Sequence, residues 1–441
     1  MPKKILILLL TVLPVFAFAG KVKVRIYSSS KIDQMNISFD VGKYVVKDAS
    51  GTVLYDTLDM NRSIELKVVG GQIKTTINGY EVGSYATLDI VSADSSSIFC
   101  INPKGKKQRT YEGDIHVKVL KNNQFLIVNE VDFETYIAGV VQSEIYGKPD
   151  QIDIFRVQAI ISRTWALRNM NKHKADGYNF CDDVHCQAYY NRCIRPEIVL
   201  GTLKSVGEIL VDASGNPIDT PFHSNSGGQT ANSEDVWKAA IPYLRSVPDT
   251  FSFNMKQSVW KKEVSKNSWL SYFSKKHSLN VSDSAVCNEL LNFTQNERKN
   301  KIMGVPLTRI RTDFKLKSTF FSVSADGEKV IISGKGYGHG VGLSQEGAIR
   351  MVTLGHSYQE ILRHYYTGAT IYRDKQLVEP KYLVYVDEIE KIIEGDKKQS
   401  TAQQAPKNNL EKMYKQKERE EREEIYVEEE QDNEAEWEYD W

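Results

Sequence analysis

Glycine occupies every second position of one run in this 441-residue chain, from Gly334 to Gly342. Each glycine inside a helix costs about 1 kcal/mol relative to alanine, so five at this spacing argue against a helix. If the run is extended, one of its faces carries no side chains, and another backbone or a flat ligand can approach closely. A structural strand that packs on a neighbour would show the same pattern. The Gly-Lys-Ser/Thr ending of a phosphate loop is missing.

Alternating apolar and polar residues predict strands in the first third of the chain. The run from Val22 to Tyr27 has period two, and so does the run 115–119. The apolar run 125–128 follows a turn signal, Asn122-Asn123, so the last two runs are expected to form a hairpin. With 41% hydrophobic residues, the chain has enough apolar material for a sizeable core.

Helical spacing replaces this alternation after Asp132, which is a good N-cap for a helix from Phe133 to Ile145. A second helix is expected from a cap at Asp150 to about Met170. Its inner face would carry Ile154, Val157, Ile161 and Trp165. Short strands and loops then return from 179 to 370, with helical stretches near 258–274 and 358–364. We therefore expect an α+β fold that is rich in β-structure and has a few helices.

The N-terminus has the pattern of a signal peptide over residues 1–19. Two lysines precede an apolar run from Ile5 to Phe16, and Ala17-Phe18-Ala19 is a small-x-small cleavage site. The run is shorter than the roughly 20 residues of a membrane span. We expect export to a periplasm or the cell surface; an uncleaved anchor is the alternative.

The charge is unevenly spread although the formal net charge is zero. Residues 410–441 hold fourteen Asp and Glu against five Lys and Arg, so the rest of the chain carries +9. We expect a linker over 373–409 and a disordered acidic tail over 410–441. The basic body suits an anionic partner, although an ordinary solvated surface explains the charge equally well.

Glu144 is the first candidate for chemistry. It shares a helix face with Ile137 and Val140, and partial desolvation there raises the pKa of a carboxyl group and favours a protonated acid. A glutamate at a helix end that points to water is the simpler interpretation of the spacing alone.

Cysteine and histidine cluster in the run Cys181-Asp182-Asp183-Val184-His185-Cys186. This run offers three ligands for Zn²⁺, and His173 or Cys193 is the candidate for the fourth. A disulfide between Cys181 and Cys186 is the rival interpretation in an oxidising compartment. A fully ligated zinc would be structural, because catalytic zinc keeps an open position.

Several of these segments, in this order, resemble the stage II sporulation protein D family (the SpoIID/LytB domain). The likeness extends over about 109–372, and its matching stretches are Val128–Tyr136, Gly139–Glu144, Gln158–Ala166, Cys181–Gln187, His223–Trp237, Pro242–Leu244, Gly336–Gln345 and His364–Gly368. The β-rich region 20–108 would precede this catalytic domain. One departure is Tyr146, which stands where the family usually has proline.

The resemblance implies a lytic transglycosylase that cleaves peptidoglycan glycan strands whose stem peptides have been removed. Glu144 aligns with the catalytic acid, and His173, Cys181, His185 and Cys186 match the zinc ligands. Glu144 would protonate the glycosidic oxygen and then act as a base on the 6-hydroxyl of the same sugar, which closes a 1,6-anhydro ring. We expect the substrate groove to be lined by His223, Ser226, Gln229, Tyr337, His339, Ser344 and Gln345.

Two other function classes remain as alternatives. Some relatives are described as enhancers of a cell-wall N-acetylmuramoyl-L-alanine amidase, so an amidase is the expected protein partner in that case. A zinc hydrolase would need an open metal position, and four clustered ligands argue against it. The polar loop His223–Thr230 has no nucleophile elbow, which argues against a serine hydrolase. We expect no nucleic-acid partner.

Overall fold

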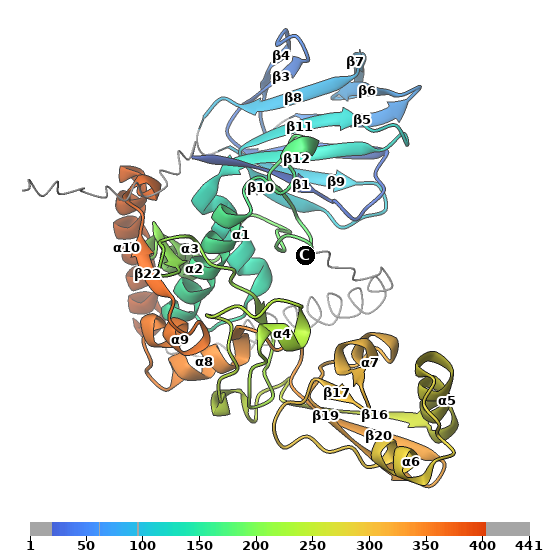
Figure 1. The fold of residues 1–441 in the computed structure, drawn as a ribbon. Helices are drawn as coiled ribbons and strands as arrows, with labels where there is room; N and C mark the ends of the chain where they lie inside the picture. The colour runs from blue at the N-terminus through green and yellow to red at the C-terminus, as the bar shows by residue number, and fades with distance from the viewer. Residues whose placement is uncertain (1–19, 61, 95–96, 403–441) are drawn as a thin grey trace, which may run out of the picture. The chain divides into compact units, whose positions relative to one another are not determined.

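The computed structural model describes residues 20–60, 62–94 and 97–402 (Figure 1). The predicted signal peptide and the acidic tail lie outside these residues, so both stay predictions. The chain divides into two compact units, Met1–Val386 and Asp387–Trp441, and every candidate site residue belongs to the first. No helix in the described part of the chain combines the length and apolar character that a membrane span needs.

Two large antiparallel-rich sheets form the N-terminal half of the described structure. The seven-stranded sheet runs, in spatial order, β13 (Phe180–Cys181), β1 (Lys21–Ile26), β12 (Phe125–Asp132), β11 (Asp114–Val119), β8 (Thr87–Ser92), β3 (Tyr44–Asp48) and β4 (Val53–Leu58). The six-stranded sheet of the described residues runs β10 (Arg109–Glu112), β9 (Ile98–Pro103), β2 (Gln34–Val41), β5 (Ser63–Val69), β6 (Gln72–Ile77) and β7 (Tyr80–Tyr85). Figure 1 shows both in blue and cyan.

Side-chain alternation explains how the two sheets share one core. In β2, Met35, Ile37 and Phe39 are buried, while Asn36 and Ser38 between them are exposed. Such period-two alternation buries one face of a strand and solvates the other. Most buried apolar residues of the two sheets belong to one hydrophobic cluster, whereas Leu126 and Val128 of β12 belong to a small separate one. The predicted hairpin is confirmed, since β11 and β12 pair antiparallel, and Asn123 in its turn has a φ of 58°.

The expected boundary at residue 108 does not separate two sheets. β1 pairs with β12 along its whole length, from Lys21 opposite Asp132 to Ile26 opposite Ile127. On its other side β1 pairs in parallel with β13, at Val24 and Phe180. The N-terminal strand is therefore completed by residues from the segment that carries the resemblance.

Two long helices follow the sheets, as the sequence predicted. α1 (Phe133–Glu144) begins at Asp132, whose side chain accepts hydrogen bonds from the backbone N–H groups of Glu134 and Thr135. α2 (Ile152–Arg168) buries Ile154, Val157 and Ile161. The predicted cap at Asp150 is wrong: Gln151 stands at the N-cap and makes no side-chain capping bond. α3 (Pro196–Lys204) packs against both helices.

A smaller lobe with its own core is inserted at residues 259–335 (Figure 1). Its elements are β16 (Val259–Ser265), α5 (Lys266–His277), α6 (Ser284–Leu291), β17 (Lys301–Ile302), β18 (Val305–Pro306), α7 (Leu307–Asp313), β19 (Phe321–Asp326) and β20 (Lys329–Lys335). The helix expected over 258–274 is wrong in its first half, because β16 pairs with β20 there. We call residues 259–335 the insertion lobe.

Short elements complete the first unit. They are β14 (Glu208–Val211), β15 (Phe222–His223), α4 (Ser233–Val236), β21 (Leu343–Ser344), α8 (Gln345–Thr353), α9 (Tyr358–Tyr365) and β22 (Thr370–Arg373). The predicted helix at 358–364 is confirmed as α9. Part of the expected linker 373–409 is helical, since α10 extends from Pro380 to Ala402. The described chain is thus a mixed α+β fold, as predicted.

Candidate functional site

Glu144 is the last residue of α1, and it is half-buried. The helix ends because Ile145 adopts an extended conformation, with φ of −132° and ψ of 138°. Behind Glu144, Val140 and Val141 are completely buried and fix the helix against the core. The carboxylate is therefore carried on a rigid element, at the point where the chain turns away.

The segment 186–194 runs along the end of α1 and holds its polar side chains. The backbone N–H of Ala188 donates a hydrogen bond of 2.7 Å to Oε1 of Glu144. The N–H of Tyr190 donates to Oγ of Ser143, and the N–H of Ile194 donates to Oε1 of Gln142. Three consecutive side chains of α1 are thus oriented by the backbone of one segment.

Gly139 allows this close approach between the segment and the helix. A Cβ at position 139 would lie 2.5 Å from the Tyr189 ring and 2.8 Å from the carbonyl oxygen of Asn191. Both distances are well inside van der Waals contact. The absent side chain at Gly139 lets the segment lie directly on α1, with the Tyr189 ring in the space that a Cβ would need.

The glycine-rich run also reaches the end of α1. Gln345, the first residue of α8, donates a hydrogen bond of 2.9 Å from Nε2 to the backbone carbonyl of Glu144. Residues about 200 positions apart therefore meet at one place. Gln345, one of the predicted groove residues, thus contacts the residue that carries the candidate acid.

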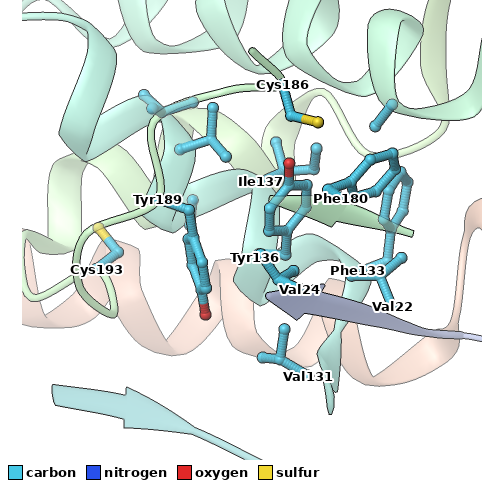
Figure 2. Close-up of a cluster of buried hydrophobic side chains, with 14 of the residues drawn as sticks. Val22, Val24, Val131, Phe133, Tyr136, Ile137, Phe180, Cys186, Tyr189 and Cys193 are labelled. Carbon is cyan, nitrogen blue, oxygen red and sulfur yellow. The ribbon is translucent and has the colours of Figure 1, made fainter. Parts of the chain in front are cut away.

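His173, Cys181, His185 and Cys186 come together in space. Their ligand atoms all lie within 4.8 Å of one another. Sγ of Cys181 is 3.5 Å from Nδ1 of His185, and Sγ of Cys186 is 3.5 Å from Nε2 of His173. All five cysteines are free thiols, so the structure does not contain the alternative disulfide. Cys193 lies apart from Cys186 and outside this group (Figure 2).

These spacings fit a tetrahedral zinc site. Zn–S bonds of about 2.3 Å and Zn–N bonds of about 2.0 Å place a sulfur and a nitrogen ligand about 3.5 Å apart. Nδ1 of His173 lies 3.3 Å from Asp176, a carboxylate in the position that commonly orients a zinc-bound imidazole. The hydrogen bond from Cys186 and the neighbouring His185 lower the pKa of the Cys181 thiol to about 5, whereas Cys181 and burial raise the pKa of Cys186.

Asp182, between the candidate ligands, ties this segment to the N-terminal strands. Its carboxylate accepts hydrogen bonds from the backbone N–H groups of Tyr27 and Ser28, and it pairs with Arg109 at 2.7 Å. The Asp182 side chain is 3% exposed, so each of these partners satisfies a buried charge. The position of the cysteine segment therefore depends on β1 and β10 as well as on α1.

Beyond β20, in which Gly334 lies, the glycine-rich run is not extended. Gly336, Gly338, Gly340 and Gly342 all have positive φ, between 69° and 110°. Other residues rarely adopt such values, so the glycines serve the turns of a loop. The loop lies against residues 225–231, with backbone bridges from Asn225 to Tyr337 and from Ala231 to Val341.

Buried hydrogen bonds engage several of the predicted groove residues. Ser226 and Ser344 are completely buried. The Ser226 hydroxyl donates to Asp249 at 2.7 Å, and Ser344 caps α8 by accepting from the N–H of Gly347. Gln229 bonds Ser246 and Arg298. These contacts show an architectural role for the three residues, and their role in binding stays a prediction.

The rings of His223 and His339 are neighbours, with a centroid distance of 5.4 Å and a tilt of 58°. Burial, followed by the proximity of His339 and Arg298, lowers the pKa of His223 well below its usual value. Burial, Arg311 and Arg298 lower the pKa of His339 to about 3. Nδ1 of His339 accepts the N–H of Val341, so its proton is on Nε2.

Sequence reasoning missed the residues that position the site. Nothing in the sequence pattern marks the backbone N–H of Ala188, since any residue other than proline supplies one. Asp182 was inside the cysteine motif, but its partners are about 155 and 73 residues away in the chain. Arg298 contacts Gln229 from the insertion lobe, and no local motif surrounds it.

The fold and the arrangement around Glu144 together describe the kind of protein to which this chain is similar. It is an α+β protein in which a glutamate ends a helix and a Cys/His segment is packed along that helix. The family model described as "Stage II sporulation protein" matches residues 121–205, which include Glu144 and all four candidate ligands. The resemblance to the stage II sporulation protein D family is thereby confirmed.

Known proteins show the same relationship over a longer part of the chain. Stage II sporulation protein D of Bacillus amyloliquefaciens is 28% identical over 294 residues, which is 61% of this chain and 82% of that protein. The Bacillus subtilis protein of the same name is 29% identical over 265 residues, or 55% and 75%. A Bacillus subtilis protein named amidase enhancer is 26% identical over 292 residues, covering 53% of this chain and 40% of that protein.

Proposed function

We propose that this protein is an exported lytic transglycosylase that cleaves peptidoglycan glycan strands lacking stem peptides. The observation that carries the proposal is the placement of Glu144 on the family-matched segment, at the end of a rigid helix and with its carboxylate oriented by the N–H of Ala188. Similarity to proteins named for sporulation and for amidase enhancement supports a role at the cell wall. The signal-peptide pattern of residues 1–19 supports export.

The proposed chemistry needs one carboxylic acid. Glu144 protonates the glycosidic oxygen while positive charge develops on the sugar, and then takes the proton of the 6-hydroxyl as that oxygen attacks the anomeric carbon. The C–O bond to the leaving sugar breaks and a 1,6-anhydro ring forms. Because the nucleophile is part of the substrate, no second carboxylate is required to activate water, unlike in most glycosidases.

Zinc would have a structural role in this protein. His173, Cys181, His185 and Cys186 would hold it with all four tetrahedral positions filled, which leaves no open position for a substrate. When bound, the metal would lock the segment whose continuation supplies the N–H of Ala188 to Glu144. The chemistry at the glycosidic bond stays with Glu144.

The test is mass spectrometry of the products that the mature protein releases from denuded and from intact peptidoglycan. We expect anhydro-muramic products from denuded strands only, and a decrease of about 100-fold or more in Glu144→Gln. Glu263→Gln, which changes an exposed glutamate of the insertion lobe, should retain wild-type activity. Undiminished product release by folded Glu144→Gln would refute the role of Glu144.

A second function is favoured by the similarity to the amidase enhancer, namely stimulation of a cell-wall amidase without cleavage of its own. The two functions differ in what the pure protein does alone. If neither substrate yields products, a cell-wall amidase is added at a fixed concentration. An amidase rate that rises with the protein, and equally with Glu144→Gln, would assign the enhancer function in place of the lyase.

A further inference from the structure

The insertion lobe presents a group of cations to the glycine-rich loop. Four positively charged side chains lie near aromatic rings there: Arg298, Arg311, Lys317 and Lys335. The rings belong to Phe320, Tyr337 and His339. Arg298 and Lys335 each lie over the Phe320 ring, 4.8 and 4.9 Å from its centroid. Lys317 lies 5.5 Å from the centroid of the Tyr337 ring. We call these four side chains the basic cluster.

Arg298 anchors the lobe to the loop. Its Nε donates to the carbonyl of Gln229 at 2.6 Å and its Nη2 donates to the carbonyl of Ser226 at 2.7 Å. A Cβ at Gly340 would lie 2.9 Å from the guanidinium. The guanidinium of Arg298 thus lies in close contact with the glycine-rich loop, and its Nε and Nη2 atoms donate to backbone carbonyls.

Arg311 lies beside the same loop, and no described residue accepts a hydrogen bond from its terminal nitrogens. Its Nε donates to the carbonyl of Leu316 at 3.3 Å, and the next carbonyl, that of Lys317, accepts the N–H of Gly338 at 2.9 Å. This connects Arg311 to the glycine between Tyr337 and His339. Arg311 is partly exposed, and burial lowers the pKa of its guanidinium.

Within the described part of the chain, the two arginines of the basic cluster have no ion-pair partner. No carboxylate oxygen of a described residue lies within 4.0 Å of the guanidinium of Arg298 or Arg311. The nearest acidic influence on Arg298 is Asp235, which is hydrogen-bonded to Asn300. Burial and the charge of Arg311 lower the pKa of Arg298 to about 9, as expected for cations that are close together and uncompensated. An anion beside them would relieve this repulsion.

We propose that the basic cluster is a carboxylate-binding subsite, which takes the lactyl carboxylate of muramic acid in a glycan strand through Arg311. This inference rests on the proposed function and names what distinguishes its substrate. A stem peptide converts the lactyl carboxylate into a neutral amide, and its removal restores the negative charge. The guanidinium fork matches a carboxylate in two parallel hydrogen bonds, and a neutral amide cannot provide both acceptors.

Tyr337 and His339, which are partly exposed, lie beside the basic cluster, and both belong to the predicted groove. Sugar rings have apolar faces that pack on aromatic side chains. A strand that lies along the glycine-rich loop would therefore meet rings and a positive charge at the same place. Selectivity for denuded strands would then come from charge recognition, at a distance from the bond that is cut.

The experiment measures binding and uses the full mature chain carrying Glu144→Gln, so that no strand is cleaved. The probes are denuded glycan strands, intact peptidoglycan strands with neutral amide links, and chitooligosaccharides of equal length, which lack the lactyl group. Arg311→Gln should raise the Kd for denuded strands about tenfold and leave the Kd for chitooligosaccharides unchanged. Lys317→Gln, a change at an exposed residue, should raise the Kd for denuded strands by a smaller factor.

The matched control is Arg309→Gln on the same helix, because Arg309 is 61% exposed and pairs with Asp313. It should leave all three Kd values unchanged. Equal weakening of every probe by Arg311→Gln, or no weakening by either cluster variant, would overturn the carboxylate subsite. Failure of the lyase proposal can be told apart from failure of the subsite. If these variants show charge-dependent binding but the wild-type protein cleaves no strand, the carboxylate subsite is supported and the lytic transglycosylase activity is rejected.

Discussion

Arg163 and Glu134 form a completely buried ion pair between α2 and α1. Their side chains are 0% and 2% exposed. Nε and Nη2 of Arg163 donate to the two carboxylate oxygens at 2.8 and 2.6 Å, and Nη1 donates to the carbonyl of Glu208 at 3.0 Å. The pair satisfies polar groups that would otherwise be costly inside the core, and it fixes the helix that carries Glu144.

Replacing Arg163 with glutamine should lower the free energy of unfolding by about 3–5 kcal/mol, because Glu134 is left as an uncompensated buried charge. Lys74→Gln is the control, since Lys74 and Glu81 pair on the surface at 42% and 58% exposure and should contribute about 1 kcal/mol or less. Urea denaturation followed by tryptophan fluorescence measures both. Similar values for the two variants would contradict this account.

Element by element, the sequence predicted what local spacing decides. The cap at Asp132, α1, the β11–β12 hairpin and α9 follow from periodicity and turn chemistry, and all are confirmed. The helix predicted over 258–264 was wrong, and the glycine-rich run, for which an extended form was one possibility, forms a loop. In both cases a partner distant in sequence decides the backbone: residues 225–231 for the loop and β20 for β16. Spacing along a chain carries no information about such partners.

Within the seven-stranded sheet, His116 bridges neighbouring strands. Its ring nitrogens lie 2.7 Å from Asp89 on β8 and 3.0 Å from Glu130 on β12. Burial opposes the charged imidazolium, but the hydrogen bonds to Glu130 and Asp89 outweigh it, so the pKa of His116 is raised. The pKa of Glu130 is correspondingly lowered to about 2.

Because the folded-state pKa of His116 is raised, its contribution to stability is complete below the unfolded pKa of about 6.5 and is lost as pH rises through the folded value. The difference in Tm between wild type and His116→Gln should therefore shrink from pH 6 to pH 9. Lys118→Gln on the same strand should show a constant difference, since lysine stays charged over most of that range. Thermal unfolding in matched buffers measures this, and a difference that grows with pH would refute it.

At the scale of the whole first unit, the cysteine segment is a junction. It pairs with β1 and lies along α1. Its Asp182 carboxylate accepts hydrogen bonds from the N–H groups of Tyr27 and Ser28 and forms an ion pair with Arg109. The clustering of ligands was visible in the sequence because four of the residues lie within fourteen positions. Its connections to the strands were not, since they depend on the tertiary fold.

Removal of zinc should therefore destabilise the unit as well as reduce cleavage. Dialysis against a strong chelator should lower the Tm by at least about 5 °C, and zinc should restore it. Cys186→Ser should have a low Tm without responding to the chelator, while Cys193→Ser should respond as the wild type does. Elemental analysis of the purified protein gives the metal content. A protein that holds no zinc and ignores the chelator would contradict the ligand assignment.

The position of β1 between β12 and β13 has a consequence for how the chain is made. β1 begins at Lys21, but its partner on one side ends at Asp132 and its partner on the other is Phe180–Cys181. At a synthesis rate of roughly 5–20 residues per second, the strand waits roughly 5–20 s for its first neighbour. Contacts so distant in sequence also form slowly once both strands exist. Of the described strands, the first to be synthesised is thus among the last to gain both of its neighbours, and the seven-stranded sheet cannot be completed before residue 181 has been made.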